Sequence, residues 1–241
     1  MNTLSSRHQP RVAVVPVRAG SKGLEGKNLL RIDDTPLYLR AVQQGLRTIG
    51  RVLLSTDIKE INQDDLPEGC TLCPRPAELS ADDTPMAPVI DHLINSMNLQ
   101  EQTLVLLQAT TPLREDYDIQ AALSLHDQGR HDLVMSVVES DPGTLKYGTL
   151  SESDFTAMRD TSHCFQNRQN LPKVHKPNGA VFVFSAASFM SCQGFPTTRV
   201  GAVEMPSDRS SDIDTLDDFL YVEQLVRSGV VADREQGCVS L

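Results

Sequence analysis

The sequence contains no tryptophan and few aromatic residues of any kind, which make up 5% of its 241 residues. No apolar run approaches the roughly 18 residues that a membrane-spanning helix requires. Residues 1–10 are polar, and the apolar run at 12–15 is too short for the core of a signal peptide. We therefore expect a cytoplasmic protein without a membrane partner.

Basic residues are the minority among the charges, with 22 Lys and Arg against 32 Asp and Glu, a net charge of −10. Nucleic acids and anionic membranes are polyanions, and proteins bind them through a basic face. The excess of acidic residues therefore argues against a nucleic-acid partner.

The five cysteines, an odd number at irregular spacing, do not form a disulfide framework. Cys70 and Cys73 make one C-x-x-C pair, but a structural zinc site needs further ligands and no second pair exists. A thioredoxin-type pair opens a helix, whereas Pro74 directly follows Cys73. We expect both side chains to lie in or near a short strand, with no redox or zinc function.

Short apolar runs alternate with segments of helical spacing along most of the chain. Strands are expected at 11–17, 52–55, 103–108, 133–138, 180–184 and 200–203, and helices at 37–49, 89–97, 119–126 and 215–228. This alternation predicts an α/β fold with a mainly parallel sheet. Ligands in such sheets bind at the carboxyl ends of the strands. Arg18, Asp57 and Gln108 each follow a strand, so we expect them along one rim.

We expect one domain at 11–228, with an N-terminal tail at 1–10 and a C-terminal tail at 229–241. The alternating pattern breaks at 140–176, which is polar and has few apolar residues to bury. We interpret this stretch as an excursion that leaves the main sheet and packs on a second copy of the chain.

Positive charge gathers in residues 11–31, which hold five basic residues and one acid, Glu25. Glycines at 20, 23 and 26 allow backbone N–H groups to approach a ligand closely. The pattern is typical of a polyphosphate cradle, although a flexible basic surface loop is the alternative. It is not a P-loop, because five residues separate Gly20 from Gly26 and Asn28 replaces the hydroxyl residue.

Acidic residues gather at 204–223. Alternation puts the carboxylates of Asp212 and Asp214 on one side of an extended segment, where they suit Mg²⁺ or Mn²⁺. Asp217 and Asp218 instead fit the first turn of the last helix, with Asp214 or Thr215 as its cap. A second basic stretch at 159–176, taken alone, is more typical of a solvated face than of a site.

Seven segments in this order resemble the acylneuraminate, or sugar-acid, cytidylyltransferase family, and within it the CMP-N-acetylneuraminate synthetases most. They are VAVVPVRAGSKGLEGKNL at 12–29, STD at 55–57, RPAEL at 75–79, LQATTPLR at 107–114, RQNLP at 168–172, KPNGA at 176–180 and SDIDT at 211–215. The resemblance implies a Rossmann-like nucleotidyltransferase fold, with helices on both faces of the sheet. It also implies that residues 140–176 form a dimerisation arm that reaches into the site of a partner.

The resemblance further implies the reaction of CTP with a nonulosonic acid, aided by Mg²⁺ or Mn²⁺, to give a CMP-sugar and pyrophosphate. The residues implied to bind CTP are Arg18, Ala19, Gly20, Ser21, Lys22, Gly23, Lys27, Asn28 and Arg75. Those implied to bind the sugar acid are Gln108, Lys146, Arg168 and Lys176. Asp212 and Asp214 would hold the metal, and Arg18 and Lys27 would offset the negative charge that grows during catalysis. The sequence does not identify the general base of the reaction, for which Asp214, acting directly or through a metal-bound water, is our candidate.

Three positions depart from the family pattern. Lys176 stands where arginine is common, Pro85-Met86-Ala87 stands where serines are usual, and Ala109 replaces a proline. N-acetylneuraminate is the favoured substrate; legionaminate, pseudaminate and an eight-carbon sugar acid are alternatives. A non-catalytic nucleotide-binding protein is a further alternative, which the intact Lys27, Asp212 and Asp214 argue against.

Overall fold

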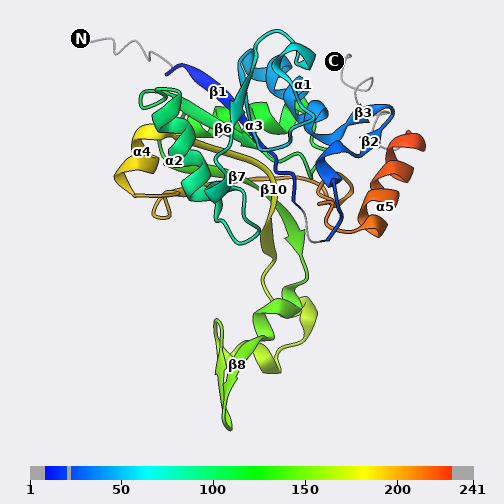
Figure 1. The fold of residues 1–241 in the computed structure, drawn as a ribbon. Helices are drawn as coiled ribbons and strands as arrows, with labels where there is room; N and C mark the ends of the chain where they lie inside the picture. The colour runs from blue at the N-terminus through cyan, green and yellow to red at the C-terminus, as the bar shows by residue number, and fades with distance from the viewer. Residues whose placement is uncertain (1–8, 21–22, 230–241) are drawn as a thin grey trace, which may run out of the picture.

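The computed structural model describes residues 9–20 and 23–229, which form a body and a protruding arm (Figure 1). A seven-stranded sheet, in the order β11-β7-β10-β6-β1-β4-β5, runs through the body. Its strands are β1 (Arg11–Pro16), β4 (Val52–Thr56), β5 (Cys70–Pro74), β6 (Thr103–Leu107), β7 (Leu133–Ser140), β10 (Val174–Ser185) and β11 (Val200–Glu204). The pairs β1–β4, β1–β6, β4–β5 and β7–β11 are parallel, so the predicted mainly parallel sheet is confirmed. Only β10 among the described strands of this sheet runs antiparallel to its neighbours, β6 and β7.

Helices cover both faces of the sheet, as expected. They are α1 (Leu37–Ile49), α2 (Met86–Ser96), α3 (Asp116–His126), α4 (Ala186–Ser191) and α5 (Leu216–Arg227). Side chains of α1, α3 and α5 pack in one apolar core, and side chains of α2 and α4 pack in a second core on the opposite face. The central strands have side chains in both cores, which explains why their sequences are continuous apolar runs.

Local sequence signals define the ends of two helices. Gly50 ends α1 with φ of 87°, a left-handed conformation that glycine adopts without strain. Thr215 begins α5 through a capping box with Asp218. The sequence placed Asp218 in the first turn of this helix and offered Thr215 as one of two caps, and the structure confirms both. Sequence analysis missed α4 and the two-stranded ribbon of β2 (Arg31–Ile32) and β3 (Thr35–Pro36), which are too short to show a period.

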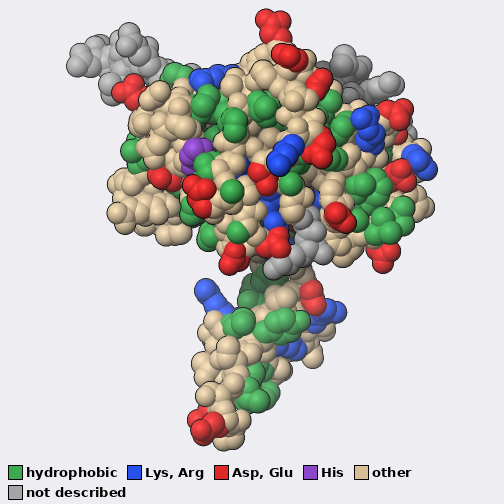
Figure 2. All heavy atoms as spheres, viewed as in Figure 1, with side chains coloured by type: hydrophobic (Ala, Val, Ile, Leu, Met, Phe, Trp, Pro, Cys, Tyr) green, Lys and Arg blue, Asp and Glu red, His purple; other side chains and the backbone are tan. Residues whose placement is uncertain are grey.

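The arm lies between the long strands β7 and β10, which extend out of the body. It contains the hairpin β8 (Gly148–Ser151) and β9 (Asp154–Ala157), with short 3₁₀ turns around it. It stands apart from the body in the space-filling view, with hydrophobic side chains on its surface (Figure 2). The arm is therefore an excursion from the main sheet, at the position the sequence indicated.

The arm is less polar at its surface than the sequence led us to expect. Five of its large apolar side chains are 52% to 86% exposed, namely Tyr147, Leu150, Phe155, Met158 and Phe165. Water contact with that much apolar surface is unfavourable, and such exposed patches mark interaction sites.

Cys70 and Cys73 lie on β5, as the sequence predicted for a short strand. Cys70 packs in one core and Cys73 in the other, so the two free thiols face opposite sides of the sheet. Burial raises the pKa of each thiol to about 11. Both are therefore packing residues, and Cys238 lies outside the described residues.

None of the described helices combines the length and the apolar character that crossing a bilayer demands.

Candidate active site

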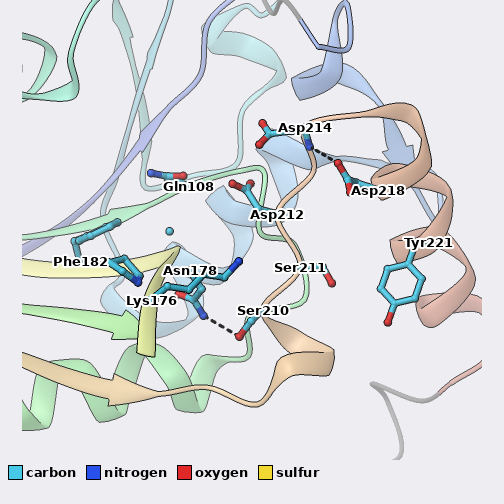
Figure 3. A pocket seen from close by; sticks show the side chains of 12 residues that line it. Gln108, Lys176, Asn178, Phe182, Ser210, Ser211, Asp212, Asp214, Asp218 and Tyr221 are labelled. Carbon is cyan, nitrogen blue, oxygen red and sulfur yellow. Dashed lines mark hydrogen bonds between the residues drawn. The ribbon is translucent and has the colours of Figure 1, made fainter. Parts of the chain in front are cut away.

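Two cavities meet at the carboxyl ends of the parallel strands, where the sequence placed Arg18, Asp57 and Gln108. The smaller has a volume of about 210 Å³ and the larger about 690 Å³. Gln108, Asp212 and Asp214 line both of them, so these three residues form the junction (Figure 3). A ligand in either cavity would therefore lie beside the same two carboxylates.

Basic side chains line the smaller cavity. Arg18, Lys27 and Arg75 contribute to its wall together with Asn28. The Lys27 ammonium donates to Asp214 Oδ1 at 2.9 Å and to the carbonyl of Ile213 at 3.0 Å. Three cations around a small cavity suit a ligand with several negative charges.

Arg18 forms an ion pair with Asp82, a residue that the sequence analysis did not single out. Asn28 is buried, and its side-chain amide donates to the carbonyl of Arg18 at 3.0 Å. Asn28 thus fixes the loop that presents Arg18, besides lining the cavity itself.

Arg75 is 8% exposed and lies against β4. It donates to the carbonyl of Ser55 at 3.0 Å and to its hydroxyl at 3.3 Å. Burial lowers the pKa of this guanidinium. Met86, at the first position of α2, also lines the cavity, so a thioether stands where the family pattern has a serine.

The glycine loop is only partly described, because Ser21 and Lys22 lie outside the described residues. Gly20 lines the smaller cavity. A methyl group on Gly23 would clash with the carbonyl oxygen of Asp214, so the close approach of this loop to residues 210–214, the acidic segment, requires glycine. The backbone N–H of Ala19 donates to Asp57 at 2.9 Å, and Ala19 is not among the residues that line the cavity.

Asp212 and Asp214 flank Ile213, which is fully buried in the core. The Ile213 N–H donates to the carbonyl of Thr110 at 2.8 Å, which holds this extended segment against the end of β6. The predicted alternation is therefore present, and both carboxylates line the same cavities. Burial, with a smaller contribution from the Asp214 charge, raises the pKa of Asp212. The neighbouring carboxylates of Asp212 and Asp214 supply the hard oxygen donors that suit a divalent cation such as Mg²⁺.

The larger cavity holds the predicted residues Gln108 and Lys176 and several that sequence analysis missed. The latter are Asn178, Phe182, Ser210, Ser211 and Tyr221 (Figure 3). Asn178 is buried and donates to the Ser210 hydroxyl at 2.9 Å, which joins β10 to the acidic segment. Asn178 belongs to the KPNGA motif at 176–180, which could have pointed to it as a site residue. It was missed because an asparagine before a glycine also fits an ordinary turn.

Gly179 leaves room for the side chain of Gln108. Its φ of 76° lies in the left-handed region, and a methyl group there would lie 2.9 Å from Gln108 Oε1. Gln108 is also held from behind by Arg114, which is 2% exposed and donates to the backbone carbonyls of Gln108 and Ala180 at 3.2 and 2.6 Å. Arg114 therefore holds the backbone of the junction residue, and Gly179 leaves space for its side chain.

The structure does not bring Lys146 and Arg168 to these cavities of their own chain. Both lie on the arm, where Lys146 donates to the carbonyl of Gln166 at 2.6 Å. Arg168 forms a bidentate ion pair with Asp141, in which Nε lies 2.7 Å from Oδ1. Within one chain the candidate sugar-acid residues are thus Gln108 and Lys176, and the two arm residues face elsewhere.

The cytidylyltransferase family model matches residues 12–226. N-acylneuraminate cytidylyltransferase from Streptococcus agalactiae serotype III is 30% identical over 88% of this chain. The match covers 52% of that relative, so the chain spans about half the length of several curated relatives that it matches. CMP-N,N'-diacetyllegionaminic acid synthase from Legionella pneumophila is 28% identical, over 89% of this chain and 95% of its own length.

A solved structure of CMP:2-keto-3-deoxy-manno-octonic acid synthetase complexed with CTP has the same fold, with a TM-score of 0.69 and 15% identity. The match covers 91% of this chain and 99% of that one. It confirms the predicted nucleotidyltransferase fold. With the family model matched from the first strand of the sheet to the last helix, the chain belongs to the cytidylyltransferase family.

Proposed function

We propose that this protein transfers a cytidylyl group from CTP to a nonulosonic acid of the N-acylneuraminate type and releases pyrophosphate. The observation that carries the proposal is the pair of cavities that meet at Gln108, Asp212 and Asp214. The relatives are named for N-acylneuraminate, diacetyllegionaminic acid and pseudaminic acid, which are all acidic sugars. Such a reaction needs one cavity for a nucleotide, one for an acid, and a shared junction.

The smaller cavity is the proposed place of the triphosphate. Arg18 and Lys27 supply the positive charge that offsets the charge growing on the leaving pyrophosphate. Asp82 forms an ion pair with Arg18 and Asp214 forms one with Lys27, so a triphosphate would replace or share these carboxylate partners. Arg75, which is buried at the cavity wall, is proposed to hold the cytidine.

Asp212 and Asp214 fit a magnesium or manganese ion, because hard oxygen donors from one extended segment face the junction. A bound cation would orient the phosphates and offset their charge. Asp214 is our candidate acceptor of the proton from the anomeric hydroxyl, because it lines both cavities. Its Oδ1 accepts a hydrogen bond from the Lys27 ammonium at 2.9 Å.

Gln108 and Lys176 are the proposed contacts to the sugar acid within one chain. Lys176 supplies a point charge, whereas arginine would grip a carboxylate through two parallel hydrogen bonds. We propose that Lys146 and Arg168 complete this site in a homodimer, in which the arm of each chain reaches the cavity of its partner. The exposed apolar side chains of the arm support that assembly.

Light scattering at micromolar concentration tests the assembly: the proposal expects twice the 26.5 kDa chain mass. A second test mixes Lys27→Ala with Arg168→Ala. Each pure variant lacks one half of every site, whereas a mixed dimer has one intact site, so mixing should restore activity if the arms cross. Two inactive variants that stay inactive after subunit exchange would contradict a shared site.

The reaction is tested by measuring CTP-dependent pyrophosphate release with a panel of acids. The panel contains N-acetylneuraminate, legionaminate, pseudaminate and an eight-carbon 3-deoxy sugar acid. The proposal expects release with at least one nine-carbon acid. Preference for the eight-carbon acid would reassign the substrate, and binding of CTP without release would favour a non-catalytic nucleotide-binding protein. Cytoplasmic location stays a prediction from the sequence.

A further inference from the structure

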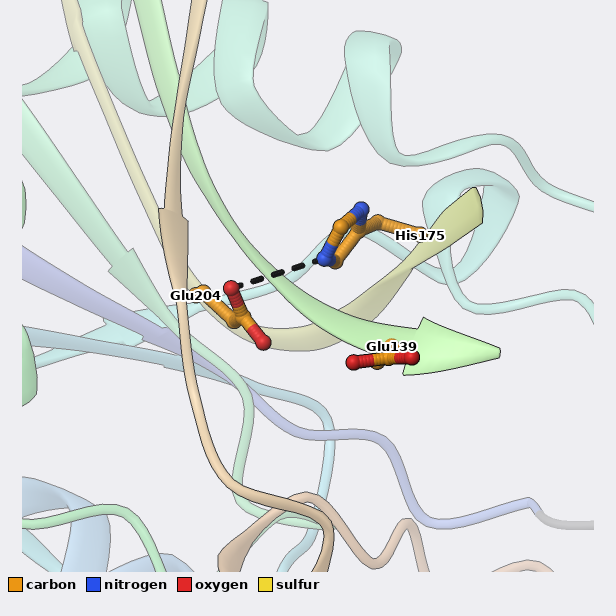
Figure 4. A group of neighbouring side chains, drawn as sticks. All are labelled: Glu139, His175 and Glu204. Carbon is orange, nitrogen blue, oxygen red and sulfur yellow. Dashed lines mark ion pairs between the residues drawn. The ribbon is translucent and has the colours of Figure 1, made fainter. Parts of the chain in front are cut away.

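A second group of metal-ligand side chains lies where the arm leaves the body, outside the two cavities described above. It consists of Glu139 on β7, His175 on β10 and Glu204 on β11 (Figure 4). One ligand atom from each residue lies within 4.8 Å of the others. We infer that this group binds a transition-metal ion such as Zn²⁺.

The strand register explains why these three side chains converge. Glu139 pairs directly with His175 across the β7–β10 ladder, and Glu204 pairs with Val137, two residues before Glu139. Because side chains alternate along a strand, Glu139, His175 and Glu204 project from the same face of the sheet. His175 and Glu204 lie on the two strands that flank β7, and they reach toward each other over it (Figure 4).

The spacing suits a small ion. His175 Nε2 lies 3.5 Å from Glu204 Oε2. Two ligand atoms of a tetrahedral zinc ion, each about 2.0–2.1 Å from it, are roughly 3.3 Å apart. A Glu139 carboxylate oxygen lies within 4.8 Å of the ligand atoms of His175 and Glu204, so a small side-chain movement would complete a set of three ligands.

A hollow lies directly beside the group. It has a volume of about 370 Å³, and its lining includes His175 and Glu204 together with Met135, Val137 and Ala202. The side chains thus leave open space on one side of the proposed ion. A fourth ligand, such as water, would occupy that side, which is the arrangement of a three-ligand zinc site.

Lys173 competes for one of the ligands, because its ammonium donates to Glu139 Oε2 at 2.9 Å. A carboxylate offers two oxygens, so Glu139 accepts the ammonium on one and binds a cation through the other. Lys173 and Glu139 are 76% and 47% exposed at their side chains, and an exposed pair of this kind contributes little stability. The ammonium is therefore a weak competitor for a divalent ion.

The donor set distinguishes this site from the Asp212 and Asp214 pair. Imidazole nitrogen selects zinc and related transition metals, whereas oxygen-only sets suit magnesium. An ion bound here would join three adjacent strands at the root of the arm. It would also hold β11, from which the chain continues to the acidic segment at 210–214.

The test is a Zn²⁺ titration of the full chain in millimolar Mg²⁺, with a chromophoric chelator as competitor, and Co²⁺ as a spectroscopic probe. The variants are His175→Ala and Glu204→Gln, and the matched controls are His92→Ala on α2 and Glu60→Gln on the surface. Asp212→Asn is a further control, because loss of that carboxylate removes the other candidate site. Circular dichroism checks that each variant is folded.

We expect one Zn²⁺ per chain, and a Co²⁺ spectrum of a four-coordinate site with a nitrogen ligand. His175→Ala and Glu204→Gln should each weaken Zn²⁺ binding by about tenfold or more. Mutation of a residue that only hydrogen-bonds to a metal ligand already lowers metal affinity by about 10- to 100-fold, and loss of the ligand itself should cost at least as much affinity. The three controls should bind as the unchanged chain does. No Zn²⁺ binding by the unchanged chain, equal binding by His175→Ala, or loss of the ion in Asp212→Asn would overturn the assignment.

Discussion

Arg114 provides the sharpest test of how the fold supports the site. The guanidinium is 2% exposed, and burial lowers its pKa to about 10. It donates to the carbonyls of Gln108 and Ala180 and, at 2.9 Å, to Gln44 Oε1. These acceptors belong to three separate segments: Gln108 follows β6, Ala180 lies within β10 and Gln44 lies on α1. One buried side chain therefore links all three segments.

Arg114→Met keeps most of the side-chain volume and removes every donor. The carbonyl of Gln108 keeps the Thr111 hydroxyl as a donor at 3.2 Å, whereas Ala180 and Gln44 each lose the guanidinium. A buried acceptor that loses its donor costs about 1–3 kcal/mol, so two of them give about 2–6 kcal/mol. This loss should exceed the gain from no longer burying the charge, because the Ala180 carbonyl lies within β10 and the Gln44 side chain is buried, so neither acceptor reaches water.

Urea unfolding followed by circular dichroism measures the effect. Arg199→Met is the matched control, because Arg199 forms a bidentate pair with Asp132 but its side chain is 56% exposed. A surface pair of this kind contributes about 0–1 kcal/mol. We expect Arg114→Met to lower the unfolding free energy by at least about 2 kcal/mol and Arg199→Met by less than about 1 kcal/mol. Equal losses in the two variants would refute the role assigned to Arg114.

Three further predictions test the site and the core. Gly179→Ala puts a methyl group 2.9 Å from Gln108 Oε1 and should raise the KM for the sugar acid several-fold. Gly129→Ala is the control, because Gly129 has a similar φ of 69° but no atom lies within 4 Å of the new methyl group. It should leave that KM unchanged. Arg168→Ala should raise the KM for the sugar acid by about 30- to 1000-fold, which corresponds to about 2–4 kcal/mol. The KM for CTP should change little. A change within about twofold in the KM for the sugar acid would show that the arm does not contact the acid. Iodoacetamide at pH 8 should label the exposed Cys192 and spare Cys70 and Cys73. A thiol with a pKa of about 11 is ionised in only about one molecule in a thousand at that pH. Labelling of Cys70 as fast as that of Cys192 would contradict its burial.

The central sheet could be predicted because its strands are continuous apolar runs separated by amphipathic helices. The arm hairpin could not, since β8 and β9 are four residues each and lie with most side chains in water. A strand without a buried face has no alternation of polar and apolar residues to detect. For the same reason β10 begins six residues before the predicted start at 180, in the polar stretch that pairs with β7.

The triphosphate cradle and the acidic pair could be predicted because charge and glycine are concentrated there in unusual patterns. Asp82 and Asn178 could not, because an acid and an amide in loops have many ordinary roles. Their positions beside Arg18 and Ser210 depend on contacts between segments 64 and 32 residues apart. The arm residues Lys146 and Arg168 show the opposite case: the resemblance named them, but one chain alone does not place them at a cavity.

The most direct test of the account compares the unchanged chain with Asp212→Asn and Asp214→Asn in one assay. It measures pyrophosphate and the CMP-linked sugar from CTP and a nonulosonic acid across a Mg²⁺ titration. We predict equal amounts of both products, dependence on Mg²⁺, and a loss of about a hundredfold or more in each folded variant, because an amide supplies no negative charge to the cation. Near-normal turnover by both variants at limiting Mg²⁺, or no product from the unchanged chain with any acid of the panel, would contradict it.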